Sequence, residues 1–196
     1  DRDSPLLTAV ATGDCEIVEC LLAAGANATL ALHAALRMAA RPEVIYILAA
    51  WCGDLNAWRP EPAAVAWARR VCEGGGPGSA SSSACSGRSS SPNRHRHSAL
   101  ERLDALLAAG ADINAVARGC EAAIHIVGRR IQEAPEQACE MQRIWHDLVA
   151  RGADAGMPDS DGRTPLERLS REQCRQLLAS KRNQYGMRRY AVSRLK

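Results

Sequence analysis

Apolar residues recur at intervals of three and four along most of the chain, a spacing typical of helices that bury one face. The clearest case is the segment ALERLDALLAAGADINA at positions 99–115. Ser98 and Glu101 have the spacing of a capping box, in which each side chain accepts a hydrogen bond from the backbone N–H of the other. Gly110 can adopt the left-handed backbone conformation that ends a helix. The pattern therefore predicts a helix that begins at Ser98 and ends at Gly110.

Similar segments occur at three more places: CLLAAGANA at 20–28, ILAAWCGDLNA at 47–57 and LVARGADAG at 148–156. Further helices are predicted between them. Pro5, Pro62 and Pro165 stand at the expected first turns of three of these helices, where the missing N–H of proline does no harm.

These features resemble the ankyrin repeat, whose first helix begins with TPLH and whose second helix ends in LLxxGADxNA. Thr164-Pro165-Leu166 is the closest match to the first motif. The resemblance implies an all-α solenoid of about five stacked helical hairpins over residues 1–180. It also implies that His33 and His125, aligned with the histidine of the motif, bond to neighbouring backbone. One departure is the loop after Gly25, which is roughly six residues shorter than a regular repeat supplies.

A glycine- and serine-rich segment, residues 73–98, interrupts the third predicted repeat. It has too few apolar residues to offset the entropy lost on ordering, so we expect a disordered insertion. Ser91, which precedes Pro92, is a candidate phosphorylation acceptor within it. Residues 181–196 form a basic tail with six lysine or arginine residues and no acidic residue. The tail is compatible with a solvated terminus, a nuclear-import or partner segment, or a nucleic-acid contact.

The composition favours thin, closely stacked helices, because alanine and leucine supply most of the apolar content and phenylalanine is absent. The eight cysteines contain no CxxC pair, so we expect free thiols in a reducing compartment, cytoplasmic or nuclear, and no metal site. Asp54, Asp112 and Asp154 recur at equivalent turns and suit turn positions. No phosphate-binding loop, HExxH or catalytic triad is recognised. The sequence thus predicts a monomer with no enzymatic activity, no cofactor and no membrane span.

The resemblance also implies where a partner binds. In the ankyrin family, the residues after the TPLH segment face the concave surface and vary with the partner. In this chain those positions include Arg37, Met38, Arg69, Arg129, Arg130 and Arg171.

Arginine pairs well with carboxylates, which favours a protein partner that has an acidic segment. The competing interpretation is that these arginines only complement the negative ends of the first helices. The expected function is a non-catalytic scaffold or adaptor that binds another protein. The alternative function is association with nucleic acid through the arginines and the basic tail.

Asn56 and Asn114 lie in two similar segments, Asp54–Ala57 and Asp112–Ala115. Both segments resemble the ankyrin motif that an iron- and oxoglutarate-dependent asparaginyl hydroxylase modifies. The resemblance implies hydroxylation as a candidate modification of the two asparagines. Both are first of all turn residues.

Overall fold

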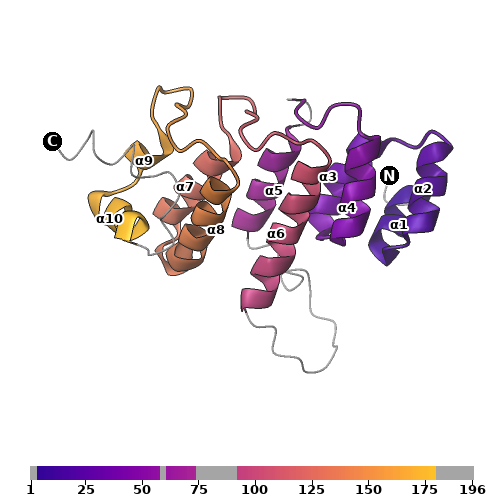
Figure 1. Ribbon diagram of the computed structural model, residues 1–196, viewed down its shortest axis with the longest axis horizontal. Helices are drawn as coiled ribbons and strands as arrows, with labels where there is room; N and C mark the ends of the chain where they lie inside the picture. The colour runs from indigo at the N-terminus through magenta and orange to yellow at the C-terminus, as the bar shows by residue number, and fades with distance from the viewer. Residues whose placement is uncertain (1–3, 58–60, 74–91, 180–196) are drawn as a thin grey trace. The chain divides into compact units, whose positions relative to one another are not determined.

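A computed structural model describes residues 4–57, 61–73 and 92–179 of this chain (Figure 1). Every regular element in these residues is helical, which confirms the predicted all-α class. The chain divides into two compact units, Asp1–Asp112 (unit 1) and Ile113–Lys196 (unit 2). The predicted basic tail and most of the predicted insertion lie outside the described residues.

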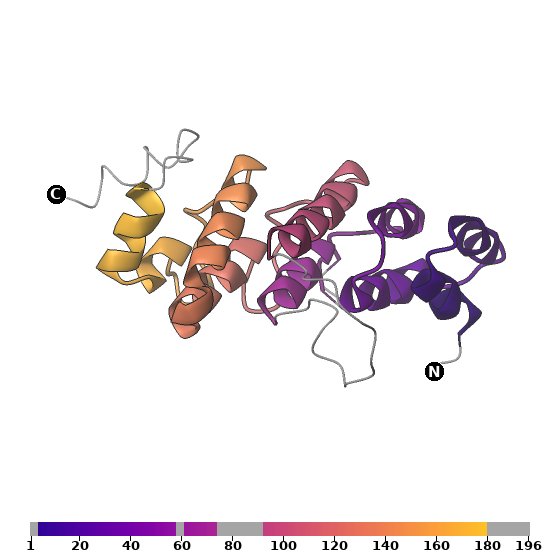
Figure 2. The same ribbon diagram turned by 90° about the horizontal axis from the view of Figure 1, so that it is seen from below.

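Within its described residues, unit 1 consists of three helical hairpins. The helices in chain order are α1 (Pro5–Thr12), α2 (Cys15–Ala23), α3 (Ala28–Met38), α4 (Pro42–Trp51), α5 (Ala63–Cys72) and α6 (Pro92–Ala108). The first helices of the hairpins, α1, α3 and α5, pack side by side in one layer. The second helices, α2, α4 and α6, pack in another layer (Figure 2). The predicted alternation of paired helices is therefore present in this unit.

The core of unit 1 lies between these two layers. Its largest fully buried side chains are Leu32, Ile45, Leu48, Trp67, Leu103 and Leu106. The alanines Ala35 and Ala68 are also fully buried, and their small side chains allow neighbouring helices to pack closely. The indole Nε1 of Trp67 donates a hydrogen bond to the carbonyl oxygen of Ala99, 2.8 Å away, which connects α5 to α6.

Local signals in the sequence set several helix ends of unit 1. The side chain of Asp14 accepts a hydrogen bond from the N–H of Ile17 at the start of α2. Gly110 has φ +98°, the left-handed conformation predicted after α6. No outward hairpin separates α2 from α3, because Asn27 follows α2 closely and caps α3 by accepting a hydrogen bond from the N–H of Leu30. The short loop after Gly25 therefore leads directly from α2 into α3, without a hairpin between them.

Two expectations for unit 1 are wrong. Helix α6 begins at Pro92 and not at Ser98, so residues 92–98 belong to a helix and not to the insertion. A helix that has formed extends cheaply, and proline is well tolerated at its first position. The apolar spacing of residues 17–22 also predicts that Ile17 faces the core, but its side chain is 49% exposed. The buried face of α2 is occupied by Val18 and Leu22, and the next residue along a helix points about 100° away.

Unit 2 contains one long hairpin and a shorter helical pair in its described residues. Its elements are α7 (Ala123–Glu133), the 3-10 helix η1 (Pro135–Gln137), α8 (Ala138–Ala150), α9 (Pro165–Arg168) and α10 (Arg171–Ala179). Helix α7 packs against both α8 and α9. The fully buried Trp145 of α8 lies against Gly128 of α7, where a Cβ atom would stand only 2.8 Å from the indole Cζ3.

Polar side chains cap the starts of both short helices of unit 2. The N–H of Thr164 donates to Glu167 Oε2 at the start of α9. At the start of α10, the N–H of Ser170 donates to Gln173 Oε1 and the N–H of Gln173 donates to Ser170 Oγ. These three side chains, Glu167, Ser170 and Gln173, satisfy backbone donors that the first helical turn leaves open, which helps to explain why two short helices form here.

Candidate functional site

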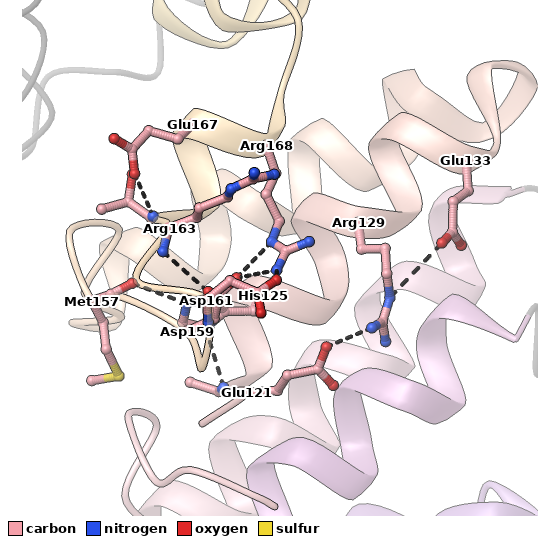
Figure 3. Close-up of polar contacts among 12 residues, drawn as sticks. Glu121, His125, Arg129, Glu133, Met157, Asp159, Asp161, Arg163, Glu167 and Arg168 are labelled. Carbon is pink, nitrogen blue, oxygen red and sulfur yellow. Dashed lines mark hydrogen bonds and ion pairs between the residues drawn. The ribbon is translucent and has the colours of Figure 1, made fainter. Parts of the chain in front are cut away.

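His125 connects the start of α7 to the loop that precedes α9. Its Nδ1 atom accepts a hydrogen bond from the N–H of Ala122, and its Nε2 atom faces the carbonyl oxygen of Met157 (Figure 3). Burial lowers the pKa of His125, although the bond to Met157 and the charge of Asp159 partly oppose this effect. The predicted structural role of His125 is thus present in the structure.

His33 does not have the corresponding position. Because Asn27 caps α3, the histidine lies well inside this helix, whereas His125 lies in the first turn of α7. The expected bond of His33 to neighbouring backbone is wrong, because His33 forms no hydrogen bond among the described residues. Burial lowers the pKa of the half-buried His33.

Two arginines predicted to bind a partner, Arg129 and Arg130, are engaged within unit 2. Arg129 Nη1 lies 2.5 Å from Glu121 Oε1, and Arg129 Nε lies 3.9 Å from Glu133 Oε1 (Figure 3). Arg130 Nη2 donates a hydrogen bond to Gln137 Oε1, 3.2 Å away. Both side chains therefore contribute to the structure of their own hairpin.

Unit 1 repeats this arrangement at Arg69. Its Nε atom lies 3.0 Å from Glu61 Oε2, and this glutamate precedes α5 as Glu121 precedes α7. Burial raises the pKa of Glu61, and the charge of Arg69 only partly compensates. An ion pair with the glutamate that precedes the helix is thus a third reason for arginine at these positions. The other two are partner binding and the favourable interaction with the negative end of the helix.

The remaining predicted contact residues are differently placed. Arg37 and Met38 are exposed at the end of α3, and Arg171 is exposed at the start of α10. In the part of the chain that the structure describes, the side chains of Arg37 and Arg171 form no ion pair. The structure thus places Arg37, Met38 and Arg69 in unit 1, and Arg129, Arg130 and Arg171 in unit 2. Ser91 lies outside the described residues.

Asn56 and Asn114 each join two turns of their own unit. Asn56 Oδ1 accepts a hydrogen bond from the N–H of Asp112, 2.7 Å away. Asn114 Oδ1 accepts from the N–H of Asp154 at 2.8 Å, and its Nδ2 donates to the carbonyl oxygen of Gly152 at 3.0 Å. The turn role predicted for these asparagines is confirmed. Their hydroxylation stays a prediction, which a gain of about 16 Da on either peptide would support.

The aspartates that recur in the sequence also serve turns. Asp54 Oδ1 accepts from the N–H of Asn56, and Asp154 Oδ1 accepts from the N–H of Gly156, as expected of turn residues. Among the described residues, no three histidine, cysteine, aspartate or glutamate side chains come together as a metal site. The cysteines in these residues are free thiols.

Asp159 holds the loop before α9. The backbone N–H groups of Asp161 and Arg163 donate to its Oδ1 atom, and the Arg168 guanidinium pairs with its Oδ2 atom (Figure 3). Burial alone would raise the pKa of Asp159, but these hydrogen bonds and the charge of Arg168 hold it below its usual value. The cluster is a structural support for α9, because it fixes the loop from which that helix starts.

The sequence analysis missed three arginines at one end of unit 1. Arg41 lies over the turn between α1 and α2, since a Cβ on Gly13 would be 3.1 Å from Arg41 Cδ. Arg102 Nε donates to the carbonyl oxygen of Ala40, 3.0 Å away. Arg70 Nε is buried and has no hydrogen-bond partner. The sequence does contain one indication of a positively charged surface here, because none of the first helices of the unit has an acidic residue.

Comparison with models of known protein families and with curated protein sequences finds no match for this chain. None of the described helices is both long enough and apolar enough to cross a lipid bilayer.

Proposed function

We propose that this chain is a non-catalytic protein-binding module of the ankyrin type, a scaffold or adaptor whose first helices meet the partner. The observation that carries the proposal is that residues in turns and at helix ends bond to one another, whereas residues on a first helix are exposed to solvent. Asn56, Asn114 and His125 join neighbouring turns and helix ends through hydrogen bonds. Arg37 and Met38 on a first helix are exposed. Stacked repeats of this kind build extended binding surfaces.

The partners of the polar side chains support a non-catalytic role. A general base must be free to take and release a proton near neutral pH. His125 instead uses both ring nitrogens in backbone contacts, and Asp159 is held as a carboxylate by Arg168 and two backbone N–H groups. The free thiols fit a reducing compartment, cytoplasmic or nuclear.

Affinity capture of the tagged full chain, followed by mass spectrometry, tests this function. We compare the unchanged protein with an Arg37→Glu/Met38→Glu variant on the first layer and with Tyr46→Glu as a control. Tyr46 is 47% exposed but lies on α4, in the second layer. A protein that is captured by the unchanged chain and by the control, but not by the first-layer variant, supports the proposal.

The same capture is repeated after nuclease treatment. A protein partner should survive the nuclease, whereas partners held through nucleic acid should disappear. Loss of all captured proteins after nuclease would favour the alternative of nucleic-acid association. Equal capture by all three proteins would mean that the first layer is not the binding surface.

A further inference from the structure

The charges of unit 1 are distributed unevenly between its two layers. The first helices α1, α3 and α5 contain no acidic residue, and they carry the arginines Arg37, Arg69 and Arg70. The second helices contain all the helical acidic residues of the unit, together with the arginines of α6. The two layers are distinct in space (Figure 2). The first layer therefore carries positive charge, while α2 and α4 carry negative charge.

Four arginines gather where the first helices end and the chain turns into the second helices. We name Arg37, Arg41, Arg70 and Arg102 the arginine edge. Two contacts place its members at the ends of the first helices: Arg41 covers the turn after α1, and Arg102 donates to the carbonyl oxygen of Ala40, directly before Arg41. Arg37 lies in the last turn of α3, and Arg70 lies in the last turn of the neighbouring α5.

Three of the four arginines of this edge lack a side-chain partner among the described residues. Within the described residues, Arg37, Arg41 and Arg70 form no side-chain hydrogen bond or ion pair, and the Nε atom of Arg70 is buried. Arg69 gives the contrast, since it pairs with Glu61. Burial lowers the pKa of Arg102, and the nearby charge of Arg70 lowers it further against the opposing effect of Glu101. Arg70 and Arg102 are half-buried and close enough for one charge to act on the other, so an anion stabilises this pair, while Arg37 and Arg41 are exposed.

Helix ends alone do not explain the arginine edge. Arg37 and Arg70 do complement the negative ends of α3 and α5. Arg41, however, is the N-cap residue of α4, where the helix dipole disfavours positive charge. Arg102 lies inside α6, away from either end of that helix. Arg102 bonds to the carbonyl oxygen of Ala40, so Arg41 is the arginine whose place neither a helix end nor a hydrogen bond explains.

We propose that the arginine edge binds an acidic segment of a partner protein, with guanidinium groups donating paired hydrogen bonds to its carboxylates. This inference rests on the proposed function and names the class of partner. A guanidinium fork matches a carboxylate with two parallel hydrogen bonds. Met38, 47% exposed beside Arg37, adds an apolar contact, so the segment combines acidic and apolar side chains.

A nucleic acid fits this edge less well than a peptide. Residues 1–112 contain ten arginines and no lysine against twelve acidic residues, a net charge of −2. A long polyanion is repelled by such a unit, while a short peptide contacts the edge locally. Single-stranded nucleic acids also need aromatic side chains for base stacking. The described exposed aromatic side chains of unit 1, Tyr46 and Trp51, lie on α4 in the other layer.

The test uses the full chain and a fluorescent peptide of about twelve residues, in which glutamate alternates with leucine and glycine. A peptide with glutamine in place of glutamate serves as its control. Fluorescence anisotropy should show that the chain binds the glutamate peptide and does not bind the glutamine peptide. The Arg37→Gln/Arg70→Gln variant should bind it at least tenfold more weakly. An Arg143→Gln/Arg163→Gln variant removes the same charge from exposed residues of unit 2 and should bind it unchanged.

Two further measurements sharpen the outcome. The Arg37→Lys/Arg70→Lys variant keeps the charge without the planar fork, so it should recover only part of the affinity. Circular dichroism and thermal melting verify that each variant folds, and Arg37→Gln alone provides a surface change if the double variant is unstable.

Three results would overturn the inference. These are absence of peptide binding, equal binding by the edge variant and the unit 2 variant, and tighter binding of an oligothymidylate of equal charge through the same arginines. If the edge fails while the full chain still captures a protein through Arg37 and Met38, only this inference is lost. If no protein partner is captured at all, the proposed function fails as well.

Discussion

The Nε2 atom of His125 lies 2.9 Å from the carbonyl oxygen of Met157 while its Nδ1 atom accepts from the backbone of Ala122 at 3.2 Å. Only the neutral imidazole that carries its proton on Nε2 makes both contacts, because an imidazolium ion has no acceptor nitrogen. The link between the start of α7 and the loop before α9 therefore depends on the protonation state of one ring.

We expect unit 2 to lose stability on mild acidification. Burial lowers the pKa of His125, so the unfolded chain takes up a proton first, at about the ordinary histidine pKa of 6.5. The free energy of unfolding should be level above this pH, fall below it, and level off again below the pKa of the folded state. Hydrogen exchange of α7 peptides, corrected for intrinsic rates, measures this at pH 7.5 and 5.5.

His125→Gln is the matched variant for this prediction. It should reduce stability at pH 7.5 but remove most of the pH dependence from α7. The peptides of α3 should keep their own dependence, since burial also lowers the pKa of His33. An unchanged pH dependence in α7 of the variant would show that another group is responsible.

Gly128→Ala should destabilise unit 2 although alanine is the better helix former. The added Cβ would stand 2.8 Å from Trp145 Cζ3, in a fully buried place. Overpacking of this kind costs about 1–3 kcal/mol, against a gain of about 1 kcal/mol in helix propensity. Gly53→Ala is the control, because nothing lies within 4 Å of its new Cβ. Equal thermal unfolding of both variants would disprove the close contact.

Asn114→Ala should cost more stability than Asn56→Ala. The first change removes an acceptor for the N–H of Asp154 and a donor to the carbonyl oxygen of Gly152. Each lost bond of this kind is worth about 0.5–1.5 kcal/mol. Asn114→Asp keeps the acceptor but turns an oxygen toward Gly152, so urea unfolding should show a loss there too. If Asn114→Ala leaves the free energy of unfolding unchanged, solvent replaces both bonds.

Arg129→Ala/Arg130→Ala should weaken partner capture at least tenfold, about 1.4 kcal/mol, if these arginines also meet a partner. The same change removes the pairs with Glu121 and Glu133, which are partly exposed and worth about 0.2–1 kcal/mol each. Glu121→Gln separates the two roles, since it breaks the pair but keeps Arg129. Weak capture by the arginine variant with normal capture by Glu121→Gln would support partner binding; equal capture by both would leave only a structural role.

The sequence predicted those features of the fold that depend on nearby residues. Asp14, Gly110 and the pair Thr164–Glu167 act at helix ends as their local pattern indicates. The start of α6 escaped prediction because Ser98 looks like a cap, yet the helix continues to Pro92. A local signal shows where a helix can begin, whereas the chain around it decides where it does.

The candidate surfaces were less predictable. Arg129 was expected to face a partner, but its bond to Glu121 depends on how two side chains lie along α7. The arginine edge includes the bond from Arg102 to Ala40, which joins residues far apart in the chain. Periodicity indicates which face of a helix is exposed, and says little about which distant groups meet there.

The direct passage from α2 to α3 through Asn27 also bears on how the protein folds. Residues 5–51 form four helices joined by short connections, so their contacts are local and the entropy of loop closure is small. By contrast, the connection of residues 73–91 must close before α5 can pack against α6. Local contacts favour rapid folding. We therefore expect the first two hairpins to nucleate unit 1 as the chain leaves the ribosome, and α6 to dock on α4 only afterwards.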